Sequence, residues 1–267
     1  MHELPLLIFT LFLQGSVGIT MWLAFRHTTL TPGNDLRRSL LPVAAGAFVM
    51  AGLGLMASAL HMGYPLNAFN ALRHVGSSWL SREIVFASLY LAALGLATLL
   101  LFTGKPGWKT LLILAAVLGL VDVFCMAQIY MHTSVVTWQH VNTLVLFIST
   151  VVILGSVVVS LVFQARRAVI YAVALIALFV LLRLLIQPLW LADVTAAGNA
   201  VVTYAHQPLA MLAQLRGVHL FSQCISVAGM LCFAAGGLKR ANGLMVTGCA
   251  LLIAGEIMLR FVFFCIG

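Results

Sequence analysis

The chain has 267 residues, of which 63% are hydrophobic and 7% are charged, and its formal net charge is +8 at pH 7. An ordinary soluble domain carries about 25% charged residues, so this composition excludes one and indicates a chain covered mostly by lipid. The positive residues form no run or stripe, which favours membrane topology over a nucleic-acid partner as the reason for the charge.

Eight apolar runs are each long enough to cross a bilayer, which takes about 20 residues. In chain order they cover 4–25, 40–60, 84–103, 109–131, 140–163, 168–191, 216–236 and 243–265. The first is too long, and lacks the basic flank, for a cleaved signal peptide. The sequence therefore predicts an all-α fold, with residues 1–267 forming one membrane domain of eight helices.

The basic residues are distributed unevenly between the two ends of the predicted bundle. One end has nine of them: Arg26, Arg37, Arg38, Lys105, Lys109, Arg166, Arg167, Lys239 and Arg240. The other end has Arg73, Arg82 and Arg216. By the positive-inside rule the first end is cytoplasmic. We therefore expect a multi-pass protein of the bacterial inner membrane, with both termini and the two long connections, 61–83 and 192–215, in the periplasm.

Four ionisable residues lie inside the predicted helices, where charges are costly and are candidates for function. They are Asp122, Arg183, Glu256 and Arg260. Glu256 and Arg260 are four residues apart and share a helix face, so we expect them to pair. Asp122 is either a residue of a proton path or a buried partner for Arg183.

The five cysteines do not indicate a metal site. All of them lie in apolar stretches, and none forms a CxxC pair: Cys125, Cys224, Cys232, Cys249 and Cys265. This pattern predicts no disulfide framework, iron–sulfur cluster or zinc site in the protein.

Polar groups concentrate at the predicted outer end. The helix ends there carry His61, His132, His140 and His219, and the connection that follows His61 leads to Ser81, a plausible N-cap, and Glu83. Imidazole takes up a proton near neutral pH, so His61 suits the oxidation of a quinol that arrives through the lipid. Glu83 would relay the proton to water, and Met62, Tyr64 and Phe69 would surround the ring.

Several segments resemble a known family. They are Leu60-His61-x-Gly63-x-Pro65-x-x-Ala68-Phe69-Asn70, Leu80-Ser81-x-Glu83, His2-Glu3-x-Pro5-Leu6, and Ala254-Gly255-Glu256-x-x-x-Arg260. Together they are similar to the membrane anchor subunit of anaerobic dimethyl sulfoxide reductase, in length and span count as well as in motif.

The resemblance implies a complex of three subunits for anaerobic respiration. A molybdopterin subunit would reduce the substrate, an iron–sulfur subunit would conduct electrons, and this anchor would bind menaquinol without haem. The resemblance also associates His61 and Glu83 with quinol oxidation. Arg82 departs from the asparagine expected at its position, and its charge is predicted to alter quinol affinity.

Two other functions are open on the sequence. A haem-b cytochrome anchor would use outer histidines such as His132, His140 or His219 as ligands. A secondary transporter would favour midplane polar sites in repeated halves, and no convincing repeat is found.

Overall fold

A computed structural model of the protein describes residues 4–30, 36–61, 72–197 and 208–266. The described residues form helices and short connections, in the order α1 (Leu4–Leu30), α2 (Leu36–His61), the short 3-10 helix η2 (Leu72–His74), α4 (Trp79–Thr103), α5 (Trp108–Met131), α6 (Asn142–Phe163), α7 (Arg166–Ala197), α8 (Pro208–Lys239) and α9 (Asn242–Ile266). Eight of these helices are long and apolar enough to cross a membrane. This confirms the predicted fold class and span count.

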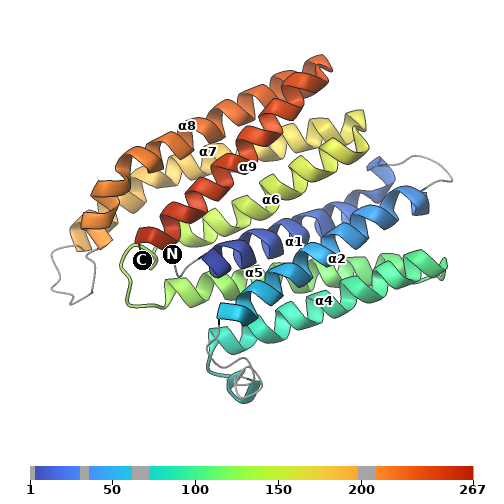
Figure 1. Ribbon diagram of the computed structural model, residues 1–267, viewed down its shortest axis with the longest axis horizontal. Helices are drawn as coiled ribbons and strands as arrows, with labels where there is room; N and C mark the ends of the chain where they lie inside the picture. Colours follow the sequence, from blue (N-terminus) through green and yellow to red (C-terminus); the bar gives the residue numbers. More distant parts are fainter. Residues whose placement is uncertain (1–3, 31–35, 62–71, 198–207, 267) are drawn as a thin grey trace.

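The long helices form two groups of four (Figure 1). Helices α1, α2, α4 and α5 pack together, α6 to α9 form the second group, and α1 joins the groups by packing along α6. At that crossing Gly18 faces Gly155, and a Cβ atom on either residue would overlap the backbone of the other helix. The absence of side chains at these two positions lets the groups approach closely.

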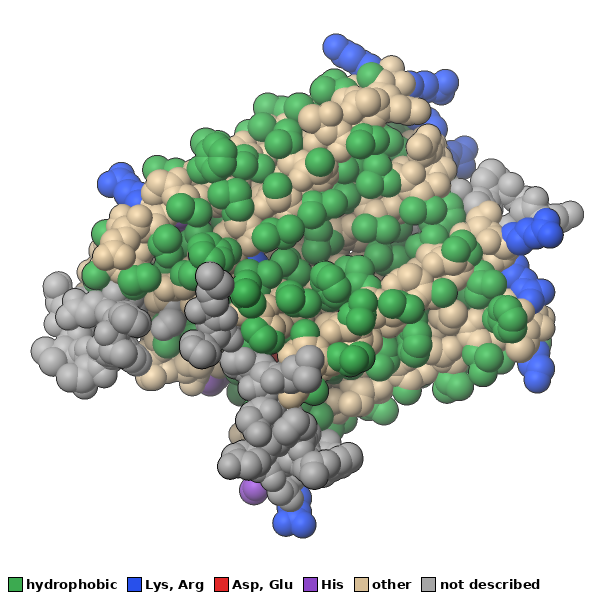
Figure 2. Space-filling view, in the orientation of Figure 1, with side chains coloured by type: hydrophobic (Ala, Val, Ile, Leu, Met, Phe, Trp, Pro, Cys, Tyr) green, Lys and Arg blue, Asp and Glu red, His purple; other side chains and the backbone are tan. Residues whose placement is uncertain are grey.

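The two ends of the bundle differ in charge. Helix α1 begins and α9 ends at the same end of the bundle (Figure 1), while most lysine and arginine side chains gather at the opposite end (Figure 2). We call these the terminal end and the basic end. Between them the surface is apolar, with side chains such as Phe102, Leu185 and Leu189 more than 60% exposed. Such a surface is suited to contact with lipid tails.

Helix α4 starts earlier than the apolar pattern predicts. The structure begins it at Trp79, and the cap is Ser78, whose hydroxyl accepts a hydrogen bond from the Ser81 amide at 3.4 Å. The prediction of Ser81 as the cap is therefore wrong. Ser78 has the extended backbone typical of a cap residue, whereas Ser81 already lies inside the first turn.

Helices α7 and α8 extend further than the sequence predicts, so the expected connection 192–215 is much shorter. Each helix has 32 residues. The end of the apolar run at 191 marks a change in polarity, but the residues that follow contain no helix breaker, and the helix continues to Ala197. Pro208 is the first residue of α8, where the missing amide hydrogen is not needed.

Candidate functional site

Two buried carboxyl groups lie on α4 and α5, two helices that pack against each other. Glu83 lies in the second turn of α4 and is 6% exposed, and Asp122 on α5 is fully buried. The two groups interact electrostatically. Neither oxygen of Asp122 has a hydrogen-bond partner among the described residues. Because a buried carboxyl without a partner is costly, this pair is suited to accept hydrogen bonds or protons from a bound molecule.

Arg82 fastens the turn that precedes α4. Its Nε donates to the carbonyl of Val75 at 2.8 Å, and its Nη2 donates to the carbonyl of Gly76 at 2.6 Å. Its guanidinium carbon also lies 4.3 Å from the ring centre of Trp79. These contacts hold the 75–79 segment against the start of α4. Arg82 therefore supports the site by fixing the backbone next to Glu83.

An aromatic cluster connects the first turn of α4 to α5 and to His132, the residue after α5. The edge of Trp79 meets Phe124 at 6.0 Å between ring centres, and Trp79 lies 5.8 Å from the ring of His132. One His132 ring nitrogen, Nδ1, is 3.0 Å from the Gln128 carbonyl. Aromatic faces beside polar acceptors are the usual lining of a site for a flat ring.

The sequence-predicted quinol residues are only partly described by the structure. Helix α2 ends at His61, at the same end of the bundle at which α4 begins (Figure 1). The side chain of His61 lies outside the described residues, as do Met62, Tyr64 and Phe69. Their roles in the site therefore stay predictions, while Glu83 and Arg82 are placed together at the start of α4.

The intramembrane charges of α7 and α9 form a second buried cluster. Arg183 donates through Nη1 to Glu256 at 2.6 Å, and the Thr150 hydroxyl donates to the other Glu256 oxygen at 2.7 Å. Arg260 donates instead to Gln14 at 2.5 Å and to Thr150 at 3.1 Å. The cluster therefore connects α1, α6, α7 and α9.

This arrangement corrects two expectations. The ion pair of Glu256 is with Arg183 and not with Arg260, because the Arg260 side chain turns towards α1 and lies over Phe147. Asp122 is not the partner of Arg183 either, since Asp122 belongs to the first helix group and Arg183 to the second. Gln14 and Thr150 were missed because a single polar residue in a membrane helix has no pattern that separates a partner from a packing residue.

A pocket also lies between the helices of the second group. The sequence does not predict it, because its lining residues come from four different helices. Arg183, Gln187 and Trp190 from α7 line it, together with His219 from α8, which lies 2.8 Å from Gln187.

The sequence matches the profile of the family described as DMSO reductase anchor subunit (DmsC) over residues 1–266. The protein belongs to this family. Its membership implies that the anchor works in a complex with catalytic and electron-transfer subunits and is a multi-pass membrane protein. It also favours the reductase interpretation over the haem-b anchor and the transporter.

Curated relatives agree with the family assignment. The anchor is 30% identical to the C subunit of anaerobic dimethyl sulfoxide reductase from Escherichia coli (strain K12), over 98% of this protein and 94% of that one. It is 28% identical to the anaerobic dimethyl sulfoxide reductase subunit YnfH of the same organism, with the same coverage. The C subunit from Haemophilus influenzae is 34% identical over 58% of this protein and 56% of that one. No solved structure matches the anchor significantly.

Proposed function

We propose that this anchor oxidises menaquinol at the terminal end of the bundle, where α2 ends and α4 begins. Oxidation of one quinol to the quinone releases two electrons and two protons. The electrons pass to an iron–sulfur subunit and from there to a molybdopterin subunit that reduces the terminal acceptor. The anchor itself supplies the quinol pocket and the proton acceptors.

The observation that carries this proposal is the buried pair of Glu83 and Asp122. Both carboxyls are buried in a membrane-spanning region, both oxygens of Asp122 lack a hydrogen-bond donor among the described residues, and the two groups interact electrostatically. A purely structural carboxyl would be expected to have a partner, as Glu256 does with Arg183. A quinol hydroxyl is a donor that fits this unfilled acceptor.

Each residue has a defined part in the proposed reaction. His61 accepts the first proton or a hydrogen bond from the ring hydroxyl, and Glu83 assists proton release. Met62, Tyr64 and Phe69 line the ring, while Arg82 holds the turn beside Glu83. Trp79, which packs against Phe124, extends the apolar surface along which the ring enters.

The charge difference between the ends supports an orientation for the site. Lysine and arginine concentrate at the basic end (Figure 2), which by the positive-inside rule faces the cytoplasm. The terminal end, both chain termini and the quinol site then face the periplasm of a bacterial inner membrane. The iron–sulfur subunit docks at this same end, which keeps the electron-transfer distance short.

The decisive experiment compares two electron sources in membranes that contain the whole complex. His61→Ala and Glu83→Gln are expected to lower menaquinol-driven reductase activity about 100-fold, the size typical of losing a proton acceptor. Activity driven by a reduced dye, which bypasses the anchor, is expected to stay at the level of the unaltered complex. Equal quinol-driven rates in variants and parent would refute the proposal, and a matching loss of dye-driven activity would indicate failed assembly.

A further inference from the structure

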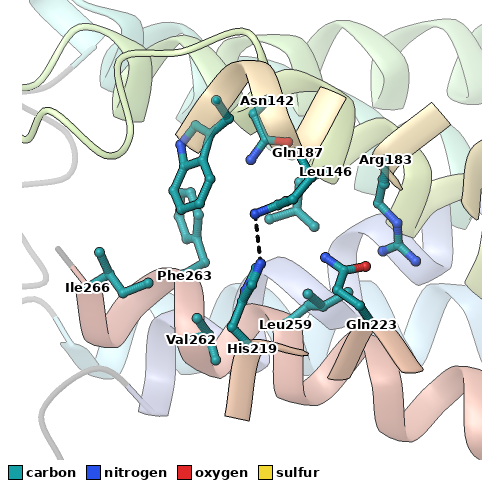
Figure 3. A pocket seen from close by; sticks show the side chains of 11 residues that line it. Asn142, Leu146, Arg183, Gln187, His219, Gln223, Leu259, Val262, Phe263 and Ile266 are labelled. Carbon is teal, nitrogen blue, oxygen red and sulfur yellow. Dashed lines mark hydrogen bonds between the residues drawn. The ribbon is translucent and has the colours of Figure 1, made fainter. Parts of the chain in front are cut away.

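The pocket of the second helix group lies away from the quinol site and is lined by α6, α7, α8 and α9. Its lining residues are Asn142, Leu146, Arg183, Gln187, Trp190, His219, Gln223, Leu259, Val262, Phe263 and Ile266. It reaches the terminal end of the bundle, since Asn142 begins α6 and Ile266 ends α9. Figure 3 shows amide, imidazole and guanidinium groups converging on it from three helices.

The buried groups behind this pocket carry one excess positive charge. Arg183 and Arg260 contribute two positive charges, and Glu256 contributes one negative charge. Arg183 is 3% exposed, and its Nε and Nη2 have no hydrogen-bond partner among the described residues. Because buried N–H donors without acceptors are costly, an anionic oxygen from outside the protein would be stabilised here.

The other polar groups can add donors to such an oxygen. His219 Nε2 lies 2.8 Å from the amide nitrogen of Gln187, which as placed can only donate. The remaining proton of a neutral His219 then resides on Nδ1, and Nδ1 is buried without a described partner. Gln223 contributes a further amide to the pocket lining.

The size of the pocket limits the ligand. The cavity has a volume of about 40 Å³, measured as the space open to the centre of a water molecule. One water requires about 10–15 Å³ measured in this way, so a compact polar group fits and a two-ring quinone does not. Apolar side chains such as Leu259 and Val262 complete the wall.

From these observations we infer that the pocket binds a phosphate group at the terminal end of the bundle. Arg183, His219 and Gln223 would donate hydrogen bonds to its oxygens. The phosphate belongs either to the headgroup of an anionic phospholipid or to free inorganic phosphate. The inference does not depend on quinol oxidation, because the pocket shares no residue with the proposed quinol site.

The test measures phosphate binding to the purified whole complex in dodecyl maltoside, a detergent without phosphate. One arm titrates radiolabelled inorganic phosphate, and the other adds phosphatidylglycerol and counts retained lipid by native mass spectrometry. Binding in at least one arm is expected, and the arm that responds identifies the source. No binding above the detergent background in either arm would overturn the inference.

Variants connect the binding to this pocket. His219→Leu and Gln223→Leu are each expected to weaken phosphate or phosphatidylglycerol binding about tenfold, which is the loss of one hydrogen bond to a charged group. Gln128→Leu, on α5 and outside the pocket, is the matched control and is expected to bind as the parent does. Unchanged binding in both pocket variants would overturn the inference.

A charge-introducing variant covers the case in which a leucine variant fails to assemble. Gln223→Glu keeps the size of the side chain and places a carboxylate in the same pocket lining as Arg183, where it would repel a phosphate. The complex is expected to assemble normally and to lose phosphate binding in each arm in which the parent binds. Full binding in this variant, or retention of a quinone in the pocket of the parent, would contradict the inference.

Discussion

Arg183 and Glu256 form an ion pair in the membrane interior, with Nη1 and Oε1 2.6 Å apart. Their side chains are 3% and 1% exposed. The pair joins α7 to α9, which are not consecutive helices, and Thr150 extends the connection to α6 through the second Glu256 oxygen. The pair is therefore a structural link of the second helix group, and Arg183 also lines the pocket of that group.

Removing one partner of this ion pair is expected to destabilise the anchor strongly. Glu256→Leu leaves the Arg183 charge buried without a counter-charge, and such single changes cost about 3–5 kcal/mol in buried pairs. We expect a lower midpoint of thermal unfolding in detergent, measured by tryptophan fluorescence. The double variant Arg183→Met/Glu256→Leu is expected to recover most of the loss, because neither charge then remains unpaired. A double variant as unstable as the single one would contradict this account.

The bonds from Arg82 to Val75 and Gly76 predict a local effect on the turn before α4. Arg82→Gln removes the charge and the forked geometry, so the two carbonyls lose their donors. We expect faster hydrogen–deuterium exchange at the amides of Ser77 and Ser78, and about a tenfold higher KM for quinol with dye-driven activity unchanged, as for the loss of a hydrogen bond to a charged group. Arg73→Gln is the control, since Arg73 is exposed on the neighbouring η2. Equal exchange in the two variants would show that Arg82 does not hold the turn.

Asp122 is expected to lower the stability of the fold and to support menaquinol oxidation. Its carboxyl is fully buried and both oxygens lack a described partner, so Asp122→Leu replaces an unsatisfied polar group by an apolar one. We expect the unfolding midpoint to rise, with a gain of about 1–3 kcal/mol. Menaquinol-driven activity is expected to fall, because the Glu83 carboxyl loses its neighbour. A destabilised variant would mean that Asp122 has a structural partner outside the described residues.

The fold and the span count could be predicted from composition and hydropathy, because lipid requires about 20 apolar residues in each helix. The concentration of lysine and arginine at one end of the bundle could also be predicted, because it follows from the order of the spans and connections. The start of α4 and the ends of α7 and α8 could not be predicted in this way. Apolar runs mark the hydrocarbon core, whereas Ser78 capping and the continuation to Ala197 depend on backbone hydrogen bonds that hydropathy does not record.

Residues of the candidate sites could be predicted only where the residue type is costly to bury in a membrane helix. Asp122, Arg183, Glu256 and Arg260 stand out as charges within spans, and all four are buried in the structure. Their partners were not predictable, since helix spacing says which residues share a face and not which way a long side chain turns. Arg260 illustrates this, because it reaches Gln14 on α1 instead of Glu256 one turn away on its own helix.

The contact between Gly18 and Gly155 predicts that the junction of the two helix groups tolerates no added methyl group. Gly155→Ala would place a Cβ atom inside the backbone of α1, and the cost of such overpacking is about 1–3 kcal/mol. Gly52→Ala on α2 is the matched control, because nothing lies within 4 Å of the Cβ that it adds. Alanine favours the helix over glycine by about 1 kcal/mol, so the control is expected to unfold at the same or a higher temperature than the parent. Thermal unfolding of both variants in the same detergent separates the two effects, and equal midpoints would mean that the junction can relax.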